Sequence, residues 1–360
     1  MRSPICLTLG ITLLLLGTAG CDDDRVGSNP RGVGSSVPPT AQSAPRAATS
    51  ASAAAAPKAS AAPAPMPKPA SPEVAKQCAL FAPPWGAGSW TQWGQDNPEQ
   101  GEEWYGTIEK TMKAADLTVL PKCRHLPYLF VGFSQLEDLK PLAELRRLRR
   151  LDLRNMPQIT DLGPLEELKE LEYLNISGTG VTDLSPLAKL PSLTEVEARY
   201  LKMTDAKDVA TLGNLRSIDF LKTPIVDVTP LAKAPKLEKA LVCTTKVADL
   251  RPLLPVANRI TALDICATPF RDFEMLAKFP KLKALRLSGM PIEDLSVLAG
   301  MKDMEDLDLS MTPIKSLKPL HGMTKLKKLS VLKLKTALPQ AEIDGLKKAV
   351  PGVTIVDQLD

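Results

Sequence analysis

The sequence predicts an α/β solenoid: a curved array of ten rungs with a parallel sheet on its concave face, short helical or 3-10 turns on its convex face, and a cap at each end. Three observations predict this fold. A unit of 22 or 23 residues recurs through residues 126–334, its apolar positions stay in register, and a proline and an aspartate recur at fixed places in most units. Units that each expose one apolar face can bury it only by stacking.

Each unit begins with an apolar residue and has further apolar residues at its fourth, sixth and eleventh positions, such as Leu171, Leu174, Ile176 and Val181. We predict that these side chains point inward. We also predict a strand at the fourth to sixth positions that pairs in parallel with the next unit. The units start at Leu126, Leu148, Leu171, Leu193, Leu215, Leu237, Ile260, Leu282, Met304 and Leu326.

The unit opens as L-x-x-L-x-L and continues into a segment of the form Asp-Leu-x-Pro-Leu, as in LEYLNISGTGVTDLSPLAKLPS at 171–192. The pattern returns in LRSIDFLKTPIVDVTPLAKAPK at 215–236 and in LKALRLSGMPIEDLSVLAGMKD at 282–303. This repeat resembles the internalin-like class of bacterial leucine-rich repeats. The resemblance covers residues 126–334. It implies a leucine-rich-repeat array, an architecture that usually binds on its concave face.

An aspartate precedes the predicted convex turn of eight units. We interpret these carboxylates as structural: each accepts backbone N–H groups at the start of its turn. The alternative is a set of metal ligands, but eight unpaired carboxylates in a column would repel one another. The column consists of Asp138, Asp161, Asp183, Asp205, Asp227, Asp249, Asp272 and Asp294.

Residues 1–20 have a positive charge at Arg2, an apolar run, and small residues before Cys21. Because the run is shorter than the roughly 20 residues that span a bilayer, it predicts a signal peptide. The small residues ending in Cys21 resemble a bacterial lipobox, although Thr18 stands where that pattern usually has leucine. The resemblance implies lipidation of Cys21; cleavage and release is the alternative. We therefore expect an exported protein, lipid-anchored in the bacterial cell envelope and facing the periplasm or the cell surface.

Residues 21–72 predict the lipidation site followed by a disordered linker. Of the 32 residues at 41–72, 26 are Ala, Pro or Ser. Such a segment has too little apolar surface to offset the entropy of ordering the chain. A flexible linker here would allow the repeats to reach away from the membrane surface.

Residues 73–125 predict an N-terminal cap, and they contain all four tryptophans. We interpret the tryptophans as a plug for the first rung, with stacking on sugars as the alternative. Cys78 and Cys123 flank the cap, and in an exported protein they predict a disulfide. Residues 335–360 predict the C-terminal cap, with a helix over 341–350 and a last strand over 353–356.

The fifth and seventh positions of the units predict the exposed concave face. The fifth column is mostly acidic, with Arg154 and Arg199 beside it, while Tyr200, Leu221, Leu241 and Cys243 predict an apolar patch near its middle. We treat this face as a candidate binding site, with an ordinary solvated sheet surface as the alternative. The candidate residues are Asp152, Arg154, Glu197, Arg199, Tyr200, Asp219, Leu221, Leu241, Asp264, Arg286 and Asp308.

Cys243 and Cys266 share the seventh column in successive rungs. Their Cα atoms are expected to lie about 5 Å apart, which a disulfide can bridge. Both a rung-to-rung disulfide and two free thiols fit the sequence. Without further ligands the pair does not predict a metal site, and the sequence predicts no metal and no cofactor.

The sequence favours a non-enzymatic module that binds a protein or peptide. No catalytic or phosphate-binding motif is present, and the two histidines fall in regions about nine units apart. A net charge of +4 is too near balance to indicate a nucleic-acid partner. The lipid anchor is the expected contact with the membrane. Binding of a cell-wall glycan or other carbohydrate through the tryptophans is the alternative function.

Overall fold

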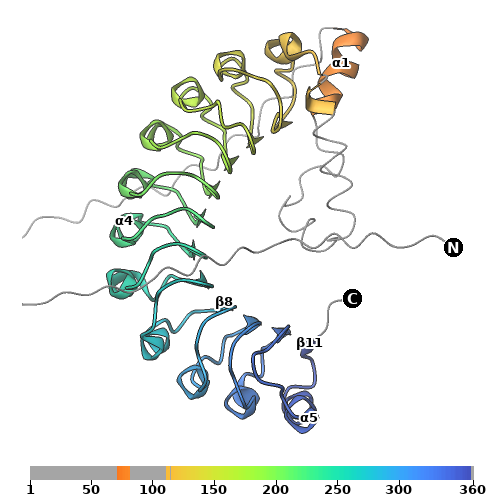
Figure 1. Cartoon of the computed structure of the whole chain (residues 1–360). Helices are drawn as coiled ribbons and strands as arrows, with labels where there is room; N and C mark the ends of the chain where they lie inside the picture. Colours follow the sequence, from red (N-terminus) through yellow and green to blue (C-terminus); the bar gives the residue numbers. More distant parts are fainter. Residues whose placement is uncertain (1–70, 82–110, 114, 358–360) are drawn as a thin grey trace, which may run out of the picture. The chain divides into compact units, whose positions relative to one another are not determined.

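The computed structural model describes residues 71–81, 111–113 and 115–357. Its centre is one open sheet of eleven parallel strands in chain order, which confirms the predicted solenoid. The strands line the inner side of an arc and the helical turns its outer side (Figure 1). The strands are β1 (Tyr128–Phe130), β2 (Arg150–Asp152), β3 (Tyr173–Asn175), β4 (Glu195–Glu197), β5 (Ser217–Asp219), β6 (Lys239–Leu241), β7 (Ala262–Asp264), β8 (Ala284–Arg286), β9 (Asp306–Asp308), β10 (Lys328–Ser330) and β11 (Thr354–Val356).

Each of the ten repeat strands pairs with the strand of the next unit at equivalent positions, so that Leu174 lies opposite Val196. The strands occupy the third to fifth positions of each unit, one residue earlier than predicted. The ladder nevertheless continues beyond the strand, because the N–H of Ile176 bonds to the carbonyl of Glu197 at 2.8 Å. The side chains of Leu174 and Ile176 are fully buried, as predicted. Each unit therefore closes its core only against its neighbours.

Short helical turns form the convex side. They are η3 (Lys140–Leu142), η4 (Gly163–Leu165), η5 (Ser185–Lys189), η6 (Lys207–Thr211), α4 (Thr229–Lys233), η7 (Arg251–Val256), η8 (Phe273–Lys278), η9 (Ser296–Leu298) and η10 (Lys318–Gly322). Proline occupies the start of most of them, where its missing N–H would have had no partner.

Seven of the eight aspartates before these turns accept a hydrogen bond from the backbone N–H two residues ahead, at 2.8–2.9 Å. Asp272 is the exception to the predicted role. The turn η8 begins directly after Asp272, which has no side-chain capping bond. The segment Phe273-Glu274-Met275 also lacks the proline found in most other units, so the turn starts one residue early relative to the column.

Both ends of the array are covered. At the start, α1 (Pro72–Cys78), η1 (Ala79–Phe81) and η2 (Leu117–Lys122) bury Phe81, and a disulfide joins Cys78 to Cys123 with Cα atoms 5.6 Å apart. At the end, α5 (Gln340–Ala349) buries Ile343 and Leu346 before β11 pairs with β10. No helix of the described segments has the length and apolar character needed to cross a bilayer. The predicted signal peptide, Cys21, the predicted linker up to residue 70 and all four tryptophans lie outside the described residues.

The eighth residue of every unit has a left-handed backbone conformation, with φ between 49° and 73°. Only Gly178 and Gly289 adopt it without a Cβ. In the other units a residue with a Cβ occupies this position, and its left-handed conformation lowers the stability of the fold by roughly 1–3 kcal/mol. The column is Phe133, Asn155, Gly178, Tyr200, Lys222, Thr244, Ala267, Gly289, Met311 and Lys333.

Glycine at position 267 is expected to stabilise the fold by about 1 kcal/mol, because Ala267 has φ of 49° and an exposed methyl group. The control is Ala299→Gly, where φ is −57° and glycine adds only entropy to the unfolded chain. Urea unfolding of the two variants should give shifts of opposite sign. Shifts of the same sign would contradict backbone strain at position 267.

Candidate functional site

Side chains of a strand alternate between its two faces, so the third, fifth and seventh positions of each unit share the concave face. The predicted face includes the fifth and seventh columns but not the third, which carries Lys239, Ala262, Ala284 and Lys328 in β6, β7, β8 and β10. The same alternation would have identified this column from the sequence.

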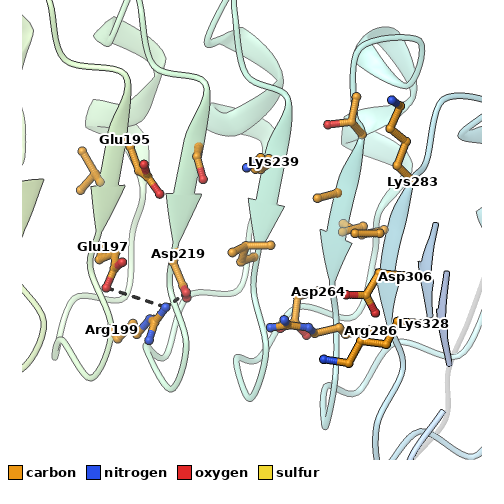
Figure 2. Close-up of a pocket in the computed structure, with 17 residues that line it drawn as sticks. Glu195, Glu197, Arg199, Asp219, Lys239, Asp264, Lys283, Arg286, Asp306 and Lys328 are labelled. Atoms are coloured by element: carbon orange, nitrogen blue, oxygen red, sulfur yellow. Dashed lines mark hydrogen bonds and ion pairs between the residues drawn. The ribbon is translucent and has the colours of Figure 1, made fainter. Parts of the chain in front are cut away.

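A groove of about 650 Å³ crosses the concave face from β4 to β10. Figure 2 shows charged side chains from these strands along its length. Two neighbouring alanines in the third column, Ala262 and Ala284, stand between the longer side chains of Lys239 and Asp306. The small side chains of Ala262 and Ala284, together with Ser217 in β5, leave space for the groove between the longer side chains of this column.

Six of the predicted concave residues line the groove: Glu197, Arg199, Asp219, Leu241, Asp264 and Arg286. Asp152, Arg154, Tyr200, Leu221 and Asp308 do not line it. Arg154 forms an ion pair with Asp152 at the N-terminal end of the sheet, with Nε 2.9 Å from Oδ1. The predicted apolar patch is not one exposed surface, because Tyr200 is 52% exposed while Cys243 is 6% exposed.

The acidic fifth column is largely buried, contrary to its predicted exposure. Asp219 and Asp264 are only 7% and 8% exposed. One oxygen of each accepts the backbone N–H two residues ahead, at 2.9 and 3.1 Å. Asp152, Asn175 and Asp308 make the same bond. Five residues of the column thus hold the backbone just after their strands, which is a structural role.

Arg199 joins two of these carboxylates at one end of the groove (Figure 2). Its Nε lies 2.7 Å from Oδ2 of Asp219, and its Nη2 lies 3.8 Å from Oε2 of Glu197. Asn175 also donates to Oε2 of Glu197, at 3.0 Å. Glu197 is 3% exposed and the Arg199 side chain 25%, so this cluster is a largely buried ionic network that lines the groove.

Neither a protein-family model nor a curated protein matches the sequence. Among solved structures, an internalin (InlF) from Listeria monocytogenes matches with a TM-score of 0.54 and 22% sequence identity, over 70% of this chain and 76% of that one. This chain has the internalin-type leucine-rich-repeat fold. Internalin C2 from Listeria monocytogenes has a TM-score of 0.47 and 26% identity, over 55% of this chain and 83% of that one. A leucine-rich-repeat protein of Leptospira interrogans has a TM-score of 0.40 and 13% sequence identity, over 66% of this chain and 79% of that one.

Two carboxyl groups in the groove of this leucine-rich-repeat array have raised pKa values. Burial raises the pKa of Glu197 to about 7, although Arg199 and Arg154 oppose the change. Burial likewise raises the pKa of Asp264 to about 6, against the backbone bond from Cys266 and the charge of Arg286. The charge of the groove therefore becomes more positive as the pH falls from 8 to 5.

Glu197→Gln is expected to change how stability depends on pH. The folded-state pKa of Glu197 is above its ordinary 4.5, so its contribution is complete below pH 4.5 and is lost as the pH rises through 7. The shift corresponds to about 3 kcal/mol between pH 4.5 and 8. A glutamine side chain cannot titrate, so the variant should gain stability over the wild type at pH 8 but not at pH 4.5. Identical urea-unfolding profiles across this range would contradict a raised pKa.

The second cysteine pair lies beside the groove. A disulfide joins Cys243 to Cys266 across two successive rungs of the leucine-rich-repeat array, with Cα atoms 4.6 Å apart. Of the two alternatives from the sequence, the structure contains the bonded form. Within the described residues, Cys243, Asp264 and Cys266 are the one group of three or more potential metal-ligating side chains whose donor atoms lie close together.

Proposed function

We propose that this chain is a non-enzymatic leucine-rich-repeat module that binds a protein or peptide in the groove of its concave face. The groove itself is the observation that carries the proposal. It is a depression of about 650 Å³ with an apolar floor at Leu241, Ala262 and Ala284 and charged side chains of both signs around it. A mixed charged rim around an apolar centre is the usual composition of a protein-binding surface.

The groove has the dimensions of a peptide site. It spans β4 to β10, and parallel strands lie about 4.8 Å apart, so its length is roughly 29 Å. An extended peptide rises about 3.3 Å per residue and would place roughly nine residues along it. Basic side chains at Lys239, Lys283 and Lys328 and acidic ones at Glu195 and Asp306 offer such a peptide partners for both signs of charge.

The contacts of the buried carboxylates support a binding rather than a catalytic role. Glu197 and Asp219 share Arg199, and the second oxygen of Asp219 is committed to the backbone N–H of Leu221. A general acid or base needs an atom within reach of the substrate proton. Here three of the four carboxylate oxygens of Glu197 and Asp219 are committed to Asn175, Arg199 and the backbone N–H of Leu221.

Ala284→Trp tests the binding site by filling the groove floor. Loss of the crosslinked partners recovered by wild-type protein from intact cells is the expected result. Leu254→Trp is the matched control, because Leu254 lies in η7 on the convex side and is 39% exposed. An Ala284→Trp protein with a wild-type circular dichroism spectrum and an unchanged set of partners would refute the groove assignment.

We further propose that the module is exported and held in the bacterial cell envelope by a lipid on Cys21, with residues 22–70 as its flexible linker. The signal-like residues 1–20 and the Ala/Pro/Ser-rich linker support this. Cells fed a radiolabelled fatty acid should label the wild-type protein and not Cys21→Ala. Label that persists in the variant would overturn the anchor.

A further inference from the structure

The bonded pair Cys243–Cys266 has a third potential ligand beside it. The two cysteines occupy the seventh positions of adjacent units, so both side chains leave the same face of the sheet. Asp264 lies on that face two residues before Cys266. One donor atom from each of the three residues lies within 4.8 Å of the other two. Two sulfurs and a carboxylate oxygen at this separation can reach a common metal ion.

The surroundings of Asp264 are those of an oriented ligand. The residue is 8% exposed, and the N–H of Cys266 fixes its Oδ1 at 3.1 Å. Its Oδ2 faces Nη1 of Arg286 at 3.7 Å, farther than a hydrogen bond. Hydrogen bonds to a ligating carboxylate hold it in position for a metal, as outer-shell partners commonly do. Cys266 is half-buried, so the site is accessible from the groove side.

We propose that reduction of the Cys243–Cys266 disulfide creates a binding site for a thiophilic divalent cation such as Zn²⁺, with Asp264 as the third protein ligand. An external dithiol supplies two electrons and two protons. The Cys243–Cys266 S–S bond breaks, two thiols form, and the external dithiol becomes a cyclic disulfide. The cation then displaces the two thiol protons to solvent and binds two thiolates, the Asp264 carboxylate and one water.

Charge favours this donor set. Two thiolates and one carboxylate around a divalent cation leave one net negative charge, which the adjacent Arg286 guanidinium balances. Sulfur ligands select Zn²⁺ and similar soft cations over Mg²⁺ or Ca²⁺. The oxidised pair has no thiolates, so the disulfide form is expected not to bind the cation. The site is therefore controlled by the redox state of one rung-to-rung bond.

Titration of the full-length chain with Cd²⁺ tests the proposal, because Cd²⁺ bound to thiolates has an ultraviolet charge-transfer absorption. The reduced wild type should bind one more Cd²⁺ than the reduced double variant Cys243→Ser, Cys266→Ser, which retains the other four cysteines. Asp264→Asn should weaken this additional binding at least ~10-fold. Equal Cd²⁺ binding by the reduced wild type and the double variant would overturn the site, and unchanged affinity in Asp264→Asn would remove Asp264 from it.

A second measurement needs no variant. In the reduced wild type, Cd²⁺ should protect Cys243 and Cys266 from alkylation, as mapped by mass spectrometry of the digested protein. Alkylation of both residues at the same rate with and without Cd²⁺ would refute the proposal. Neither measurement depends on the peptide-binding function, so each result stands apart from the fate of that proposal.

Discussion

Replacing Cys78 and Cys123 together with alanine is expected to lower the free energy of unfolding by about 4 kcal/mol, since the bond closes a loop of 45 residues. Both cysteines are fully buried, and the bond ties α1 to η2 over the first rung. Without it the cap must be held by packing alone. Because each rung touches only its neighbours, the loss should begin at this end of the array.

In the variant without Cys78 and Cys123, with the Cys243–Cys266 bond kept oxidised, the backbone amides of residues 117–131 should therefore exchange hydrogen faster than in the wild type, with little change near β8. Urea unfolding followed by circular dichroism gives the overall loss. A variant with less than about 1 kcal/mol of destabilisation would show that the bond constrains the unfolded chain far less than its loop length implies. Uniformly faster exchange along all strands would instead contradict an end-localised role.

Arg199→Gln is expected to destabilise the protein by about 3 kcal/mol at pH 8, because it leaves Glu197 and Asp219 buried with reduced compensation. The loss should be smaller at pH 5. The pKa of Glu197, already raised to about 7, would rise further without the guanidinium, and the protonated carboxyl needs no counter-charge. Urea unfolding at the two pH values measures both effects.

The matched control is Arg216→Gln, which breaks an ion pair with Glu238 in which both side chains are more than a third exposed. Exposed pairs contribute at most about 1 kcal/mol. If the two substitutions have the same effect at pH 8, the cluster around Arg199 is solvated like any surface pair. The description of Glu197 as a desolvated group would then be wrong.

The repeat period allowed the fold to be predicted almost completely. Apolar residues at fixed positions define which side chains are inward, and the stacked units leave one arrangement of parallel strands. The strand boundaries differ by one residue because hydrogen bonding between units begins before the predicted strand: the N–H groups of Glu172 and Tyr173 both bond to the carbonyl of Arg149, at 2.8 and 3.1 Å. Leu174 and the equivalent residues show which positions of the repeat face inward, but they do not show at which residue the hydrogen bonds between strands begin.

The site was less predictable, because exposure on a concave sheet depends on neighbours from other units. The alternation of a strand places Asp219 and Asp264 on the correct face, yet it does not reveal that adjacent side chains and a backbone N–H enclose them. The groove contains the small third-column residues Ser217, Ala262 and Ala284, which are recognised as one column only when successive units are aligned on their third position. The ion pair between Arg199 and Asp219 joins two neighbouring units, and only the three-dimensional structure reveals it.

The one-repeat register of the strands has a consequence for how this surface can change. Since Leu174 pairs with Val196, and each later unit pairs in the same way, the order of charges along the groove copies the order of units in the chain. Duplication or loss of one unit would shift every later charge by one strand spacing, about 4.8 Å. The remaining units would still make the same type of core contact with their neighbours. The binding specificity of this surface could therefore change in increments of one unit, through gain or loss of whole repeats rather than through single substitutions.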